Sequence, residues 1–331
     1  MRLDDVVKIY SPNTTSRSFM ADTDGLKCIH YGDIYKNYSD REIDSSNIQN
    51  SISLEFPEHK VIKRNAIIVA DVSETLDDWG HVTFIKYDGT PFINGTHTLA
   101  IVCDCATTLR YLFYYFRDET TRKRLRQFLT GVTVFQMSIK SLNKYKIDQP
   151  PLPTQTRIAE ILSAYDDAIE NNNRRIVLLE KAARELYREW FVRMRFPGHE
   201  SAKFVNGLPE GWERKKLGVI CNNNIFSGGT PTTTTADYWN GQFKWLSSGE
   251  TRNRFIVDTE KTITQLGVNE SSTRLANNGD IVMACAGQGN TRGQTSLLLC
   301  DMYINQSVIA IRSMFCAFVL YNLVGRYNEL R

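Results

Sequence analysis

The strongest pattern in the chain is a run of apolar residues between Pro153 and Pro197. Successive members are separated alternately by four and three residues for more than four heptads. This spacing places them on one stripe of an α-helix that packs against another helix. We predict a helix over residues 151–196, on the order of 60 Å long. The predicted stripe contains Ile158, Leu162, Tyr165, Ile169, Asn172, Ile176, Leu179, Ala183, Leu186 and Trp190.

This stripe needs a partner, because a single helix with one apolar face is not stable in water. Asn172, in the middle of the stripe, is the kind of polar residue that fixes the register of a helix pair. No other part of the sequence has comparable heptads. We expect the partner helix to come from another chain or from sequence beyond Arg331.

Short runs typical of β-strands lie on both sides of the helix, and a helical pattern follows each set. The first set covers residues 60–70, 82–87 and 99–102, with the helical pattern at 109–129. The second set covers residues 244–247, 280–284, 296–300 and 307–312, with the helical pattern at 318–323.

The two flanks also match in sequence. The matching pairs are residues 27–33 with 244–250, 65–70 with 279–284, and 92–94 with 303–305. Three weak matches in one order indicate a tandem repeat. The predicted fold class is α+β: two tandem mixed α/β domains joined by a long coiled-coil-forming helix.

The predicted boundaries follow from these patterns. The first domain covers residues 1–150, the helix 151–196, a linker 197–216 and the second domain 217–331. The second copy ends at Arg331, soon after its helical pattern, so we expect it to be incomplete at its C-terminus.

The composition is that of a globular protein, with 42% hydrophobic and 23% charged residues. The longest apolar runs are too short to cross a bilayer, and the N-terminus is acidic where a secretion signal needs basic and apolar residues. We expect a cytoplasmic protein without membrane contact. The seven cysteines agree with this expectation, because their number is odd and they lack zinc or redox spacing.

No catalytic motif is visible in the sequence. It lacks the phosphate-binding loop with Gly-Lys-Ser/Thr and the HExxH zinc motif. The glycine-rich segment 287–293 precedes a predicted strand, whereas a dinucleotide-binding turn precedes a helix. The acidic residues of 71–78 are more typical of a solvated loop than of a metal site. We therefore predict no catalytic residue, no metal site and no cofactor bound by this chain.

Residues 117–146 carry eight Lys and Arg side chains against two acidic ones, interleaved with aromatic residues. Side chains of this kind contact phosphates and hold a protein on double-stranded DNA. An amphipathic helix with a solvated basic face would produce the same pattern. The predicted phosphate contacts are Arg122, Lys123, Arg124, Arg126, Lys140 and Lys144.

Two loops are candidates for base recognition, because they follow matching strands but differ completely in content. They cover residues 71–81 and 286–294. Arg, Asn and Gln side chains make paired contacts with base edges in the major groove. Ordinary drift of loops after a duplication is the alternative. The predicted base contacts are Ser73, Trp79, His81, Gln288, Asn290, Arg292 and Gln294.

Several segments resemble one known family. The segment Pro150-Pro-Leu-Pro-Thr-Gln155-Thr-Arg-Ile158, continued to Asn171, and the segment Leu186-Tyr-Arg-Glu-Trp190 resemble the central conserved helix of the specificity subunits of type I restriction–modification enzymes. Leu208-Pro-Glu-Gly-Trp212 is similar to that family's linker into its second target recognition domain. Phe226-Ser-Gly-Gly-Thr230 is similar to the start of such a domain.

The resemblance implies a non-catalytic subunit. Two target recognition domains would each bind half of a split DNA site in the major groove, and two long antiparallel helices would set the spacer. Modification (methyltransferase) subunits with S-adenosylmethionine and a restriction (translocase/nuclease) subunit using ATP and Mg2+ would dock on this scaffold. A second specificity chain or fragment is one source of the partner helix. The alternatives are a truncated or silent specificity cassette without independent activity and, less supported, a stand-alone nuclease.

Overall fold

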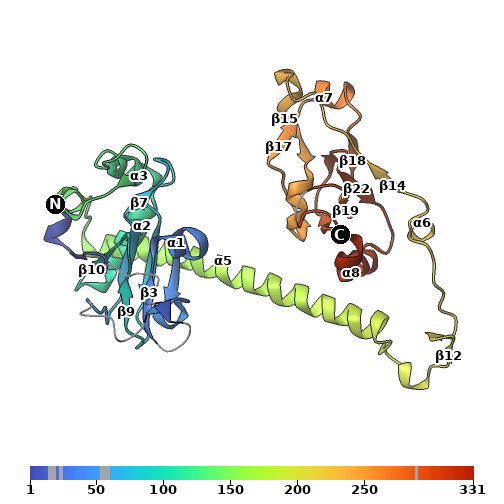
Figure 1. Ribbon diagram of the computed structural model, residues 1–331, viewed down its shortest axis with the longest axis horizontal. Coiled ribbons are helices and arrows are strands. Elements are labelled where there is room, and N and C mark those ends of the chain that lie inside the picture. The colour runs from blue at the N-terminus through green and yellow to red at the C-terminus, as the bar shows by residue number, and fades with distance from the viewer. Residues whose placement is uncertain (14–19, 22–24, 53–59, 288–289) are drawn as a thin grey trace. The chain divides into compact units, whose positions relative to one another are not determined.

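A computed structural model describes residues 1–13, 20–21, 25–52, 60–287 and 290–331 (Figure 1). The chain divides into two compact units, Met1–Asn173 (unit 1) and Arg174–Arg331 (unit 2). The division falls within the long helix α5, Leu152–Tyr187. Each unit contains its own buried hydrophobic clusters.

Unit 1 is built on two sheets. The larger has the strand order β1-β10-β6-β8-β4, in which β4 runs parallel to β8 and the other neighbours are antiparallel. Its strands are β1 (Lys8–Tyr10), β10 (Thr98–Val102), β6 (Ala66–Ala70), β8 (Val82–Lys86) and β4 (Arg41–Asp44). The smaller has the order β2-β5-β3-β9, with β2 (Met20–Ala21), β5 (Ser51–Ile52), β3 (Leu26–Ile29) and β9 (Phe92–Asn94).

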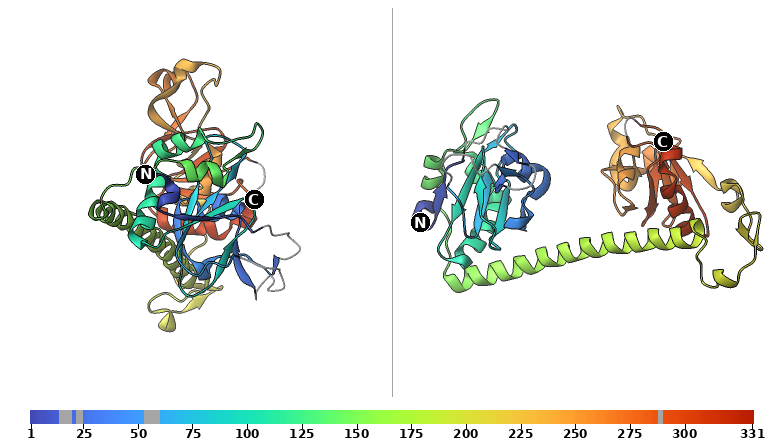
Figure 2. Two further views of the ribbon diagram at one scale, coloured as in Figure 1. Left: turned by 90° about the vertical axis from the view of Figure 1, so that its left-hand side faces the viewer. Right: turned by 60° about the horizontal axis from the view of Figure 1, so that its bottom comes forward.

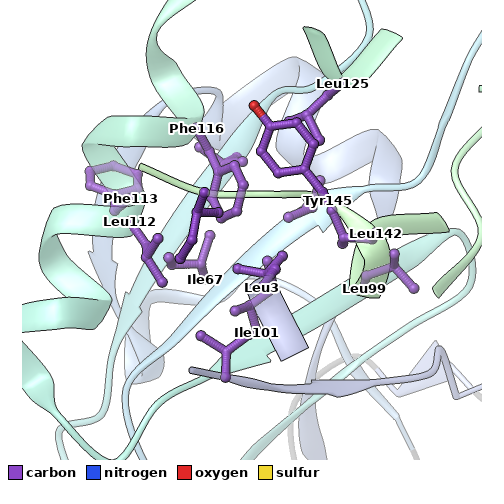
Figure 3. Close-up of a cluster of buried hydrophobic side chains, with 14 of the residues drawn as sticks. Leu3, Ile67, Leu99, Ile101, Leu112, Phe113, Phe116, Leu125, Leu142 and Tyr145 are labelled. Carbon is purple, nitrogen blue, oxygen red and sulfur yellow. The ribbon is translucent and has the colours of Figure 1, made fainter. Parts of the chain in front are cut away.

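Both faces of the larger sheet are covered, which is why β6 reads as a continuous apolar run. Ile67 faces a cluster that includes helix α2 (Ala106–Arg117), whereas Ile68 faces the cluster on the other side. Figure 3 shows the first cluster, where Phe113 and Phe116 of α2 lie with Leu3, Leu142 and other apolar side chains. The alternation of neighbouring residues therefore connects the sheet to two separate cores.

The remaining elements of unit 1 are short. They are the helical turns η1 (Leu3–Asp5), α1 (Tyr31–Asp33), η3 (Ile34–Tyr38) and η4 (Ser45–Asn47), the strand pair β7 (Val72–Ser73) and β11 (Phe135–Gln136), and the helices α3 (Glu119–Arg126) and α4 (Ile139–Lys144). The predicted helix 109–129 is two helices, because the chain leaves helical geometry at Asp118. The Asp118 carboxylate accepts a hydrogen bond from the Thr121 amide at 2.8 Å and caps α3.

Unit 2 repeats this architecture. Its larger sheet has the order β14-β22-β19-β20-β16, again with one parallel pair at the edge. Its strands are β14 (Ile225–Ser227), β22 (Val308–Ile311), β19 (Ile281–Ala284), β20 (Thr295–Leu298) and β16 (Phe255–Ile256). Its smaller sheet contains β17 (Lys261–Ile263), β15 (Trp239–Leu246), β21 (Met302–Ile304) and β18 (Arg274–Ala276).

The other elements of unit 2 are helices, turns and one small hairpin. They are η6 (His199–Ser201), the hairpin β12 (Phe204–Val205) and β13 (Leu208–Pro209), α6 (Leu217–Ile220), η7 (Ala236–Tyr238), η8 (Ser248–Arg252), α7 (Gln265–Asn269), α8 (Cys316–Gly325) and α9 (Tyr327–Leu330).

Strand register confirms two of the three sequence matches and corrects the third by one residue. Ile67 pairs with Ile101 in unit 1, as Ile281 pairs with Ile311 in unit 2. Cys28 pairs with Ile93, and its counterpart Trp245 pairs with Tyr303. Residues 92–94 therefore correspond to 302–304, not 303–305. A one-residue shift would turn every side chain of the strand to the opposite face.

Helix α5 continues into a wider helical turn, η5 (Arg188–Val192), so the predicted long helix is confirmed (Figure 2). Ile158 is half-buried against the core of unit 1, and Trp190 is also half-buried. The rest of the predicted stripe except Ala183 is exposed, with fractions for its large apolar side chains from 38% at Leu162 to 66% at Tyr165 and Leu179.

Other faces of α5 contact the two units. In unit 1, Asp166 accepts hydrogen bonds from Arg117 (2.5 Å) and from the Tyr114 hydroxyl (3.0 Å). In unit 2, Tyr187 accepts a hydrogen bond from the Asn322 amide at 2.8 Å. Each unit therefore holds one end of α5 through polar contacts together with apolar ones, Ile158 in unit 1 and the Tyr187 ring against Phe318 in unit 2, and the middle of the apolar stripe stays exposed.

Candidate nucleic-acid interface

The basic segment of unit 1 separates into exposed and buried cations. Lys123, Arg124, Lys140 and Lys144 are exposed. Arg124 forms an ion pair with Asp148 at 3.2 Å, and both side chains remain more than half exposed. The three lysines form no ion pair with any residue that the structure describes. These four side chains are available to phosphates.

Arg122 and Arg126 are different, and the structure corrects their predicted role. Each side chain is 10% exposed. The Arg122 guanidinium donates to the carbonyl of Phe116 at 3.1 Å and to the Asp40 carboxylate. Arg126 donates to Glu119 at 2.9 Å and to the carbonyl of Asp77. Both cations are used inside unit 1, because a buried guanidinium must be paired.

The first predicted base-reading loop is also more buried than expected. Trp79 is 1% exposed, and its indole Nε1 donates to the carbonyl of Asp71 at 3.3 Å. Ser73 is buried in β7. The structure therefore makes Trp79 a core residue that anchors the loop, and it leaves neither side chain at the surface where a base edge could be read.

His81 lies at the centre of a polar cluster. Its Nδ1 lies 2.6 Å from the Ser39 hydroxyl and 3.1 Å from Asp40, and its Nε2 lies 3.0 Å from Asp78. The hydrogen bond with Asp40 raises the pKa of His81 above its ordinary value, against the effect of burial, and Asp78 adds to the rise. Burial alone would raise the pKa of Asp40, but His81 and Arg122 lower it below its ordinary value.

In the second loop, Asn290 and Arg292 are exposed and Gln294 is half-buried. Gln294 Oε1 has no hydrogen-bond partner among the described residues. Gln288 lies outside the described residues. The loop keeps polar side chains at the surface, as base recognition requires, but the structure does not test which of them contact DNA.

The two units present different side chains on the same backbone frame. The amide of Ala70 donates to the carbonyl of His81, as the amide of Ala284 donates to that of Gln294. The amide of Asp71 donates to the carbonyl of His97 at 3.2 Å, and the amide of Cys285 donates to that of Ser307 at 2.9 Å. Asp71, His81 and His97 in unit 1 thus correspond to Cys285, Gln294 and Ser307 in unit 2.

His97 was not among the predicted site residues. It lies in the turn between β9 and β10, three residues after the third repeat match, and its side chain is 46% exposed. Its Nδ1 lies 3.8 Å from Oδ1 of Asp71, whose side chain is 5% exposed. The ring of Tyr31 contacts the His97 ring edge to face at 5.5 Å. No motif in the sequence marks this position; the strand register, which aligns His97 with Ser307, identifies it.

Among the described residues, no group of three or more His, Cys, Asp or Glu side chains is placed to hold a metal ion. None of the described helices combines the length and apolarity needed to cross a bilayer.

The sequence model of one protein family, described as type I restriction modification DNA specificity domain, matches residues 1–181 and 209–320. The chain belongs to this family. The resemblance found in the sequence is confirmed, as is the fold class of two mixed α/β domains with a long central helix.

Named relatives of this specificity-domain protein are specificity subunits. The MjaIX specificity subunit of Methanocaldococcus jannaschii is 25% identical over 194 residues, which cover 57% of this chain and 44% of that subunit. The HindI specificity subunit of Haemophilus influenzae is 22% identical over 331 residues, covering 80% of this chain and 70% of that subunit. The chain thus spans less than half the length of the MjaIX subunit.

The fold of this specificity-domain protein also has a solved counterpart. The crystal structure of a type I restriction–modification system S subunit from M. genitalium superposes with a TM-score of 0.57 at 13% sequence identity. The superposition covers all of this chain and 77% of that one. At this identity the likeness establishes the fold.

Proposed function

We propose that the chain recognises a two-part site on double-stranded DNA, one half with each unit, within a type I restriction–modification complex. The observation that carries this proposal is the match between the C-terminal ends of β6 and β19. The same backbone hydrogen bonds surround both strand ends, but the side chains there differ. Recognition of two different half-sites needs this combination, because the frame fixes the approach to the duplex while the side chains read the bases.

In this proposal the exposed stripe of α5 receives a helix from a second specificity chain or fragment. The completed scaffold then docks the modification and restriction subunits in the cytoplasm. The partner subunits bind and use S-adenosylmethionine, ATP and Mg2+, and this chain supplies recognition without catalysis. Membership of the specificity-domain family and the uncovered stripe support this assignment.

The proposal is tested by assembling the full chain with modification subunits and selecting bound duplexes from a random DNA pool. We expect a motif of two short half-sites separated by a spacer of fixed length. Enrichment of a single half-site would show that only one unit reads DNA. An assembled complex that enriches no sequence would contradict the proposal.

Phosphate contacts by the exposed lysines give a separate prediction. Replacing Lys123, Lys140 and Lys144 by alanine should weaken binding to all sequences and reduce the slope of log affinity against log salt by about three, close to one per lost contact. Lys86→Ala, at an exposed strand end of the same unit, serves as the control. An unchanged slope would remove the three lysines from the DNA interface.

A further inference from the structure

At the C-terminal end of β6 in unit 1, a buried carboxylate oxygen has no hydrogen-bond donor among the described residues. Asp71 follows β6 directly and is buried. Its Oδ2 accepts a hydrogen bond from Nε2 of Gln136 at 3.3 Å, but its Oδ1 has no hydrogen-bond partner among the described residues. A buried carboxylate oxygen without a donor is costly, so a donor is expected to approach it in the functional state.

The imidazole of His97 is the nearby group that can supply this donor. Its Nδ1 lies 3.8 Å from Oδ1 of Asp71, beyond hydrogen-bond length, and hydrogen bonds of functional sites often shorten only when the ligand is bound. Tyr31 contacts the same ring, and the His97 backbone has φ +60, a conformation that few residues other than glycine adopt. Asp71, Tyr31 and the turn thus restrict one exposed ring.

The tautomer of His97 that hydrogen-bonds to Asp71 determines whether Nε2 is a donor or an acceptor toward a ligand. A neutral imidazole that donates Nδ1–H to Asp71 keeps a lone pair on Nε2, because only one of the two nitrogens then carries hydrogen. Nε2 is therefore a hydrogen-bond acceptor, on a side chain that is 46% exposed. In the major groove, the donors that it can read are the amino groups of cytosine (N4) and adenine (N6).

We propose that His97 reads the amino group of one cytosine or adenine in the half-site of unit 1, with Asp71 as the residue that positions it. This inference rests on the proposed function. Unit 2 supports it, because the same frame carries Cys285 and Ser307 at the two matched positions. A structural requirement of the fold for an Asp–His pair would apply to both units, whereas recognition of different bases requires the pair to differ.

The test starts from the site selected by the assembled wild-type complex. His97→Gly removes the ring and suits the positive φ of this position, so folding should be preserved. We expect it to lose discrimination at one base pair of one half-site by roughly fivefold to 100-fold, the range of a good base contact. Asp71→Asn should lose part of the discrimination at the same base pair, and Lys86→Ala should lose none.

Base analogues make the test specific to the amino group. Replacing the affected cytosine by 2-pyrimidinone, or the affected adenine by purine, removes only that group. We expect the analogue to reduce the DNA affinity of the wild type about as much as His97→Gly reduces it on the natural base. We expect the analogue to cause no further loss of affinity in the His97→Gly variant. Full additivity of the two changes would overturn the assignment.

Other results separate the failure of this inference from that of the proposed function. A selected two-part motif that His97→Gly leaves unchanged would overturn the role of His97 alone. An equal loss of affinity on all sequences would make His97 a phosphate contact and would also overturn its role as a reader. The absence of any selected motif in the wild type would overturn both proposals.

Discussion

Replacing Leu162, Ile169 and Ile176 together by glutamate is expected to abolish the proposed assembly of the chain with a partner helix and with modification subunits. All three side chains belong to the stripe of α5 and are at least 38% exposed in the chain alone. Burying each of them against a partner helix would contribute about 1.5–3 kcal/mol, and three buried carboxylates would each add a large desolvation cost. The loss should therefore exceed a thousandfold in assembly affinity.

The measurement is size-exclusion chromatography with light scattering on mixtures of the chain and the modification subunits. The matched control replaces Glu170, Arg174 and Lys181 by alanine. These three residues are exposed on the same helix and lie outside the stripe. The control should assemble as the wild type does.

Far-ultraviolet circular dichroism compares the helix content of the glutamate variant with that of the wild type and so checks that the variant is folded. A folded glutamate variant that assembles normally would show that the stripe has no helix partner. A variant that assembles but selects a different DNA motif would contradict the separation between spacer and base recognition.

The sequence predicted those features that depend on local periodicity. The heptads of α5 and the apolar runs of β6 and β19 are visible because a helix or a buried strand repeats its burial pattern within a few residues. The tandem repeat was visible for the same reason. Even there, local matching aligned residues 92–94 one position too far, and only pairing with a distant strand, β3, set the register.

The candidate site was predicted less well, because residue type does not determine burial. Arg122 reads as a phosphate contact in a basic helix, yet its partner Asp40 lies 82 residues earlier in the chain. Trp79 reads as an exposed aromatic in an acidic loop, yet its ring fills the core beneath that loop. His97 has no motif around it, and its relation to Asp71 appears only after β6 and β10 pair. Contacts between distant segments decide all three cases.

The cluster around Asp40 gives the second large prediction. Replacing Arg122 by methionine should destabilise unit 1 by about 1–3 kcal/mol, because the Phe116 carbonyl loses its side-chain donor and the Asp40 carboxylate, which is 25% exposed, keeps only His81 and the Val82 amide. Arg110→Met is the matched control: it breaks the ion pair with Glu42, in which both side chains are about 30% exposed. That pair should contribute about 1 kcal/mol or less. Hydrogen exchange of the β6 and β10 amides measures both variants within unit 1.

The same cluster should make the stability of unit 1 depend on pH. The pKa of His81 is raised in the folded chain above its ordinary value of 6.5. The charged imidazole therefore stabilises the fold fully below pH 6.5, and this contribution is lost as the pH rises through the folded pKa. Asp40 acts in the opposite range, because its lowered pKa gives a contribution that is lost only in acid.

The measurement compares wild type with His81→Gln by hydrogen exchange of residues 76–82 and 119–126, corrected for the intrinsic exchange rate at each pH. Burial lowers the pKa of His30, which gives the opposite slope, but His30 is present in both proteins and its contribution cancels in the difference. We expect the wild type to be the more protected below pH 6.5, with the difference shrinking as the pH rises further. A difference that is constant with pH would show that His81 stabilises this cluster by packing and neutral hydrogen bonds, without its charge.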